Sequence, residues 1–184
     1  MATTDDYLTG PSSVRLRPVE QGDLELLLRW DEDPVIAALM GRRFENTSPA
    51  EWFSAQRRMR SYRIWIIERG EQPVGEVELA QVNHRTRSAE VRICVGEREL
   101  WGQGIGTTAM TRALDEAFGP MALDEVYLRV FANNGRAIAL YDRLGFQPAG
   151  VLRPSRRRND PAPVLLMRLT RHRWQSHRKS GRAS

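Results

Sequence analysis

Three glycines at alternate positions, Gly102, Gly104 and Gly106, lie between an apolar run and a helical run. The apolar run, residues 89–95, has the length of a strand, and residues 105–118 have a helical pattern. Glycine allows the backbone to approach a ligand closely and to adopt conformations that a side chain would forbid. The start of a helix adds unpaired N–H groups and the positive end of the dipole. The sequence therefore predicts a phosphate-binding turn.

Two familiar phosphate sites fit this turn poorly. A P-loop needs a lysine before its final serine or threonine, and this turn has none. The dinucleotide fingerprint G-x-G-x-x-G/A is formally met between Gly104 and Ala109. However, the polar residues 96–99 separate the turn from the apolar strand. In addition, Asp124 and Glu125 precede the next strand, whereas a ribose-binding acid should end it.

The segment from Trp101 to Gly106 resembles a third kind of site, the pyrophosphate loop of the GCN5-related N-acetyltransferase (GNAT) family. That loop is written Q/R-x-x-G-x-G/A, and both of its glycines, Gly104 and Gly106, are present. Trp101 departs from the usual Gln or Arg at the first position. Because that position contributes mainly through its backbone, the departure weakens the resemblance only a little.

A second motif lies downstream, in residues 133–146. It resembles the GNAT segment N-x-x-A-I-x-L-Y-x-K-x-G-F, with Asn134 and Tyr141 at the asparagine and tyrosine positions and Arg143 where lysine is commoner. By itself the segment is a short helix, with Asn134 as its cap and Gly145 as its stop. Both motifs in the family's order, however, indicate membership of the family.

The resemblance covers residues 13–170 and implies one α/β domain with the GNAT fold. This fold has a mixed, mostly antiparallel, splayed sheet flanked by helices. We expect polar tails at residues 1–12 and 171–184. The expected strands are residues 14–17, 62–68, 74–82, 89–95, 124–131, 146–152 and 164–169. The expected helices begin near residues 23, 33, 48, 105 and 134.

The composition of the 184 residues suits a globular cytoplasmic protein. No apolar run reaches the roughly 18 residues that cross a membrane, and residues 1–10 lack the basic and apolar regions of a signal peptide. Cys94 is the only cysteine, so no internal disulfide can form. No Cys/His cluster indicates a metal site. We therefore expect neither a metal nor a membrane partner.

The net charge of +5 is unevenly distributed along the chain. Residues 153–184 hold ten basic residues and one acidic residue, so the rest of the chain carries −4. Basic runs can bind nucleic-acid backbones, but they are also common at solvated chain ends. We expect no nucleic-acid partner, and the acidic body favours a cationic ligand.

The resemblance implies acetyl-CoA as co-substrate and direct attack by a neutral amine. The reaction needs a proton acceptor for the amine, an N–H donor for the oxyanion and a proton donor for the thiolate. Glu90 is the candidate base, with Glu76 and Glu78 as alternatives, and Tyr141 is the candidate acid. The expected cofactor contacts are Ile93, Cys94, Val95, Trp101, Gly102, Gln103, Gly104, Ile105, Gly106, Thr107, Asn134 and Arg136.

The acceptor should be bound by the N-terminal helices and the strands before the glycine turn, as in the family. Residues 31–33 are all acidic and have aromatic neighbours, which suits a cationic amine. Residues 16–18 and 28–30 resemble two GNAT branches, one acting on ribosomal-protein N-termini and the other on aminoglycosides or polyamines. We prefer the small cationic amine. The alternatives are a protein N-terminus and a non-catalytic acyl-CoA sensor; a homodimer is a possible assembly.

Overall fold

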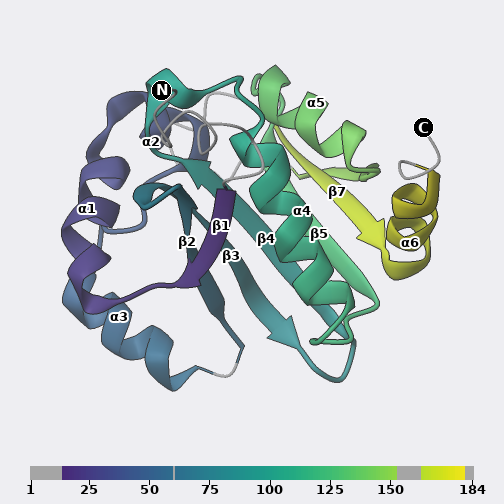
Figure 1. Cartoon of the computed structure of the whole chain (residues 1–184), viewed down its shortest axis with the longest axis horizontal. Helices are drawn as coiled ribbons and strands as arrows, with labels where there is room; N and C mark the ends of the chain where they lie inside the picture. Colours follow the sequence, from purple (N-terminus) through teal and green to yellow (C-terminus); the bar gives the residue numbers. More distant parts are fainter. Residues whose placement is uncertain (1–13, 60, 153–162, 181–184) are drawn as a thin grey trace, which may run out of the picture.

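The computed structural model describes residues 14–59, 61–152 and 163–180, which share one seven-stranded sheet of order β1-β2-β3-β4-β5-β7-β6 (Figure 1). The strands are β1 (Val14–Pro18), β2 (Arg63–Arg69), β3 (Gln72–Asn83), β4 (Ser88–Val95), β5 (Glu125–Phe131), β6 (Gln147–Leu152) and β7 (Val164–Thr170). The helices are α1 (Leu24–Glu32), α2 (Pro34–Met40), α3 (Pro49–Arg58), α4 (Ile105–Phe118), α5 (Gly135–Arg143) and α6 (Arg171–Ser180). This is the mixed, mostly antiparallel arrangement that the sequence predicts.

The sheet splits between its two central strands. β4 and β5 form the one parallel pair among the described strands, and their register covers only Ser88–Glu90 against Glu125–Tyr127. Beyond Glu90, β4 continues to Val95 with β3 as its partner, while β5 continues to Phe131 with β7 as its partner. The two halves therefore separate toward the glycine turn, as expected for a splayed sheet.

Helices cover the two faces of the sheet unequally. On one face α4 packs across the central strands and shares their apolar core, as Figure 1 shows. On the other face α1, α2 and α3 pack against β2 and β4 through a second, smaller cluster. The members of that cluster are Leu27, Trp30, Ile36, Trp52, Ile64, Ile66 and Cys94. Beyond this second cluster, the same face carries the buried carboxylates of Glu76, Glu78 and Glu90 on β3 and β4.

The N-terminal helices begin at the caps that the sequence indicates. Asp33 accepts hydrogen bonds from the backbone N–H groups of Val35 and Ile36, and Pro34 follows it as the first residue of α2. Ser48 and Glu51 form a capping box at the start of α3, again with a proline in the first turn. The Asp33 cap therefore fixes the start of α2, and the Ser48 cap fixes the start of α3.

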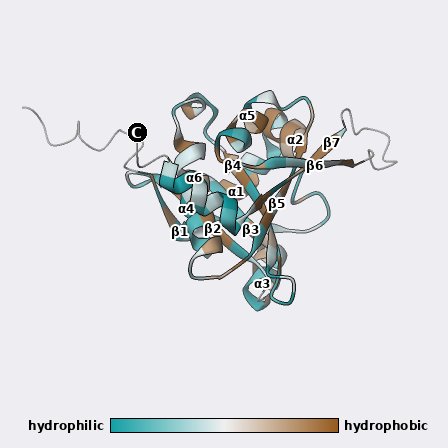
Figure 2. Cartoon of the chain, turned by 90° about the vertical axis from the view of Figure 1, so that its right-hand side faces the viewer, coloured by the Kyte–Doolittle hydropathy of each residue, from teal (hydrophilic) through white to brown (hydrophobic). Residues whose placement is uncertain are grey.

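The C-terminal segment differs from the expected polar tail. Residues Arg171–Ser180 form α6, and Trp174 on it is 3% exposed. Its indole N–H donates to Asp115 of α4 at 3.1 Å, and its ring packs near Phe118. Nine of the ten residues of α6 are polar, and the helix is strongly hydrophilic (Figure 2). The polar composition of this segment therefore gave no indication that Trp174 would fix it against α4. The expected tail at 1–12 lies outside the described residues.

Candidate active site

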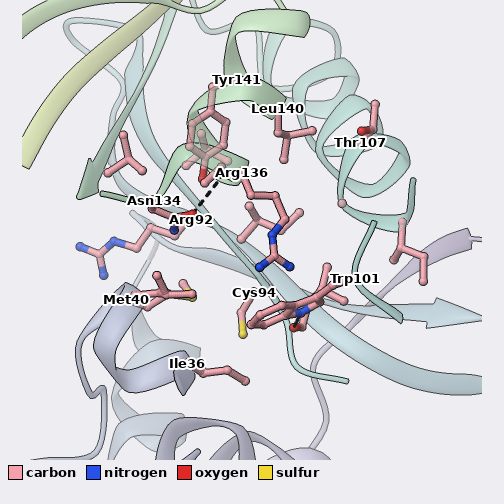
Figure 3. A pocket seen from close by; sticks show the side chains of 18 of the residues that line it. Ile36, Met40, Arg92, Cys94, Trp101, Thr107, Asn134, Arg136, Leu140 and Tyr141 are labelled. Atoms are coloured by element: carbon pink, nitrogen blue, oxygen red, sulfur yellow. Dashed lines mark hydrogen bonds between the residues drawn. The ribbon is translucent and has the colours of Figure 1, made fainter. Parts of the chain in front are cut away.

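A cavity of about 750 Å³ occupies the place where β4 and β5 separate. One wall comes from the glycine turn and the start of α4, another from α5, and a third from α2 (Figure 3). Residues of β4 from Glu90 to Val95 line it with alternating faces. The cavity therefore passes through the split and connects the α4 side of the sheet with the α2 side.

The start of α4 lacks the side-chain cap that begins α2, α3 and α5. Its N-cap is Gly104, in the left-handed region at φ 80°, and no acidic residue lies in the first turn. Thr108 N–H already bonds to the Gly104 carbonyl, but the N–H groups of the preceding helical residues have no intrahelical partner. An uncapped, glycine-flanked helix start of this kind can hold an anion through its backbone.

Trp101, the unusual first residue of the loop, is held in place by two contacts. The indole N–H donates to the Val95 carbonyl at 2.6 Å, which ties the loop to the end of β4. The guanidinium of Arg136, from the first turn of α5, lies 4.0 Å from the centroid of the Trp101 ring (Figure 3). The pair therefore brings a fixed positive charge across the mouth of the cavity, beside the helix start.

Tyr141 projects from α5 into the same cavity (Figure 3). Its side chain is buried, and its hydroxyl forms no hydrogen bond with any described residue. Burial raises the pKa of Tyr141 to about 12, because the charged phenolate would be poorly solvated there. The hydroxyl therefore stays protonated throughout the physiological range.

Glu90 lies at the point where β4 and β5 part and is 1% exposed. Arg129 of β5 donates two hydrogen bonds to its carboxylate, at 2.8 and 2.9 Å. Arg92 donates two more, at 3.1 and 3.2 Å. Burial alone would raise the pKa of Glu90, but the hydrogen bonds and charges of both arginines outweigh it and hold the pKa below its usual value. Glu90 is therefore ionised and only weakly basic.

The alternative bases Glu76 and Glu78 do not line the cavity. Both lie on β3 and pair with Arg43, at 2.8 Å from Glu76 and 3.1 Å from Glu78. Glu78 also contacts Arg92 at 3.3 Å and accepts a hydrogen bond from the Tyr62 hydroxyl. The carboxylates on this sheet face are thus matched by arginines.

Cys94 lines the cavity but is 6% exposed. Burial raises the pKa of its thiol, and the nearby negative charge of Glu76 adds to this effect. The sulfur is therefore held as an uncharged thiol and behaves as a packed side chain.

The acids at residues 31–33 have structural partners. Asp31 accepts the backbone N–H groups of Arg43 and Phe44. Asp33 caps α2 and lies 3.4 Å from Arg98. Both carboxylates therefore hold the chain itself, and our expectation that this cluster faces a cationic ligand stays a prediction.

Comparison with known proteins decides the family. The family model described as "Acetyltransferase (GNAT) domain" matches residues 13–147. This chain belongs to the GNAT family. It is therefore an acetyl-CoA-dependent N-acetyltransferase, and the GNAT interpretation of the glycine turn holds against the dinucleotide one.

Two curated relatives of this GNAT enzyme are polyamine acetyltransferases. The spermidine N(1)-acetyltransferase of Escherichia coli K12 is 33% identical over 145 residues, which cover 76% of each chain. The spermidine N(1)-acetyltransferase of Vibrio cholerae is 32% identical over 149 residues, covering 77% of this chain and 83% of the relative. A crystal structure of spermidine N-acetyltransferase from Vibrio cholerae with CoA and spermine superimposes with a TM-score of 0.82 at 27% identity, covering 89% and 99% of the two chains.

The described residues of this GNAT site fit acetyl-CoA. Backbone N–H groups from residues 105–107 can hold its pyrophosphate, Arg136 adds a positive charge to the cavity wall, and the cavity also reaches Tyr141. All but one of the expected site residues line this cavity: Glu90, Ile93, Cys94, Val95, Trp101, Gly102, Gly104, Ile105, Gly106, Thr107, Asn134, Arg136 and Tyr141. The exception is Gln103, whose side chain bonds to the Glu99 carbonyl and to Arg69.

Sequence reasoning missed two parts of the GNAT site. The first is the pair of arginines that bind Glu90, Arg92 and Arg129. Strand alternation could have predicted Arg92, because it lies two residues after Glu90 on β4 and therefore on the same face of the sheet. The second is the apolar end formed by α2, whose Ile36 and Met40 project into the cavity (Figure 3). No local signal separates these side chains from ordinary core residues.

Two other observations concern the described residues as a whole. Within residues 14–59, 61–152 and 163–180, no three His, Cys, Asp or Glu side chains gather where they could hold a metal ion. In the same ranges, none of the helices has both the length and the apolar character needed to cross a bilayer.

Gly106→Val should weaken acetyl-CoA binding roughly tenfold or more, because the branched side chain would cover backbone donors that a charged pyrophosphate needs. A Cβ at Gly106 would lie 3.6 Å from Leu140 and 3.7 Å from Val95, both ordinary contacts, so the fold should persist. Isothermal titration calorimetry and thermal melting measure the two effects. Gly150→Val is the matched control, since nothing lies within 4 Å of a Cβ there. Unchanged affinity in Gly106→Val would mean that this turn does not hold the pyrophosphate.

Proposed function

We propose that this enzyme acetylates a primary amine of a small cationic acceptor, and that a linear polyamine is the first candidate. The observation that carries the proposal is the identity of 33% over 76% of the chain to a spermidine N(1)-acetyltransferase. The split sheet supports it, because the cavity reaches from the helix start to the apolar α2 wall, where an alkylamine chain can lie.

Bound acetyl-CoA supplies the acetyl group and the thiolate leaving group. In our proposal Tyr141 donates the proton that the thiolate needs, since its neutral phenol lies free in the cavity. Backbone N–H groups of β4 near Ile93 and Val95 stabilise the oxyanion, because β4 has no strand partner on its β5 side after Glu90.

Glu90 is our proposed proton acceptor, reached from the amine through water. It is the one acidic side chain among the described residues that line the cavity. Its lowered pKa makes it a weak base, so it serves as an ionised relay while the pH of the solvent sets how much free amine exists. Arg92 and Arg129 hold its carboxylate in place, whether Glu90 accepts the proton itself or only relays it through water.

Two further expectations remain proposals. We propose that the reaction takes place in a reducing cytoplasm, which agrees with a single, buried, free cysteine. We also propose that the protein self-associates, at least as a dimer. The support is that a solved spermidine N-acetyltransferase from Vibrio cholerae is described as dodecameric. In addition, the edge strand β6 exposes Val151 and Leu152, at 65% and 40%.

An acceptor panel tests the substrate class. The protein is incubated with acetyl-CoA and, separately, with linear polyamines, aminoglycosides and N-terminal peptides of ribosomal proteins, and products are identified by mass spectrometry. We expect a single acetyl group on a terminal amine of the polyamines. Modification of the peptides alone would overturn the proposal. Binding of acetyl-CoA without turnover of any amine would indicate a non-catalytic sensor.

Tyr141→Phe should lower kcat by roughly one to three orders of magnitude, the scale of a general acid's contribution. Affinity for acetyl-CoA should change little, because only the hydroxyl is lost. Tyr127→Phe is the matched control, since that hydroxyl bonds to Gln81 and Tyr127 does not line the cavity. Steady-state kinetics and calorimetry separate the two quantities. Wild-type turnover in Tyr141→Phe would assign the thiolate's proton to solvent.

Glu90→Gln should reduce turnover most at low pH and recover in part as the pH rises toward the pKa of the amine, about 10 for an alkylammonium. The sign follows from the lowered pKa of Glu90: its carboxylate stays charged down to a lower pH than an ordinary glutamate, so the rise of activity toward the pKa of the amine reports free amine. Glu68→Gln is the control, because Glu68 is also buried and paired with two arginines, Arg15 and Arg17, outside the cavity. A constant activity ratio between Glu90→Gln and wild type across pH would make Glu90 a structural residue.

A further inference from the structure

A box of aromatic and acidic side chains surrounds the guanidinium of Arg43, in the segment between α2 and α3. The guanidinium carbon lies 4.9 Å from the ring centroid of Trp52 and 5.8 Å from that of Phe44. Glu76 accepts a hydrogen bond from Nη1 at 2.8 Å, and Glu78 accepts one from Nη2 at 3.1 Å. Aromatic faces and carboxylates together are the groups that bind an organic cation.

The box is closely packed around its occupant. The side chains of Arg43, Glu76 and Glu78 are 18%, 9% and 2% exposed. Tyr62 donates its hydroxyl to Glu78, and its ring lies edge-on to Trp52. A cation in such a dry position gains more from aromatic faces and carboxylates than a cation at an exposed site does.

The box lies one strand away from the acceptor end of the cavity. In the β3–β4 register Glu76 is opposite Cys94, and Glu78 is opposite Arg92. Both Cys94 and Arg92 line the cavity, and neighbouring strands are about 4.8 Å apart. Arg43 therefore pairs with two carboxylates that lie one strand beyond the cavity wall.

Both the backbone and the side chain of Arg43 are fixed in the box by hydrogen bonds. Asp31 accepts the backbone N–H groups of Arg43 and Phe44, so the segment is fixed at this point as well as through the guanidinium. Glu76 has no other basic partner among the described residues, whereas Glu78 also contacts Arg92. Removal of Arg43 would leave Glu76 as a buried carboxylate in need of a cation.

We propose that Arg43 is a specificity-determining residue: it fills an ammonium site with the chain's own guanidinium and so excludes the distal ammonium of the acceptor from the box. The proposal rests on the proposed function, since it concerns how that acceptor is bound. In this arrangement the enzyme recognises the reacting end of the amine, and the box adds no preference for a second positive charge.

Arg43→Ala tests the proposal by opening the box. We compare kcat/KM for spermidine with kcat/KM for n-butylamine, which has one ammonium group. The ratio should rise roughly 10- to 100-fold over wild type, the scale of a hydrogen bond to a charged group. Arg42→Ala is the matched control, because Arg42 contacts Asp31 and Glu32 outside the box, and its ratio should stay at the wild-type value. A ratio in Arg43→Ala within about twofold of wild type, well below the gain expected from one charged hydrogen bond, would overturn the proposal.

A double variant distinguishes the effect of the unpaired carboxylate from the effect of the volume that the Arg43 side chain leaves. Arg43→Ala with Glu76→Gln keeps the opened volume but removes the carboxylate that lost its partner. The gain in the ratio should disappear in this variant if an ammonium occupies the box. A gain that persists would attribute the effect to extra room and would contradict a cation site.

Binding measurements keep the proposal testable whatever the activity or stability of the variants. Methylguanidinium should raise the melting temperature of Arg43→Ala, or its yield on refolding, whereas neutral methylurea should not; equal effects of the two compounds would contradict the proposal. Spermidine should likewise stabilise Arg43→Ala more than wild type. If wild type acetylates no small cationic amine, the proposed function fails, while these two comparisons still decide whether the box binds cations.

Discussion

The brief parallel pairing of β4 with β5 is the constraint on which the rest of the site depends. Only three residues of each strand are in register before the strands part. Each then keeps a partner on its far side, β3 for β4 and β7 for β5, so the sheet stays whole while its centre opens. The opening gives one cavity access to both faces. A fully paired sheet would close that cavity and leave the start of α4 without an adjoining acceptor end.

Opposite charges are matched along one face of this opening. Three buried carboxylates, at Glu76, Glu78 and Glu90, are met by three arginines, at Arg43, Arg92 and Arg129. Unpaired charges at these depths would be costly, so the pairs make these buried carboxylates compatible with a folded core. The pairing also changes the chemistry expected of the acids, since it lowers the basicity of Glu90 and binds Glu76 and Glu78, which do not line the cavity, to Arg43.

Local signals predicted most of the fold and much of the cavity lining. The caps at Asp33 and Ser48, the alternating strands and the paired glycine and Asn134 motifs each depend on residues near one another in the sequence. The acceptor side depends on contacts between segments that are far apart in the sequence, such as those of Arg43 with β3. The spacing of residues along the chain does not predict such contacts. For the same reason a polar composition hid Trp174, whose partners Asp115 and Phe118 lie on another helix.

The uncharged thiol of Cys94 constrains the order of events. It is the nearest sulfur nucleophile in the cavity wall, yet burial keeps it protonated and therefore unreactive toward an acyl group. Cys94 is therefore unsuited to store the acetyl group after the first product leaves. Direct attack by the amine on bound acetyl-CoA agrees with this, and such a reaction should follow a sequential, ternary-complex scheme.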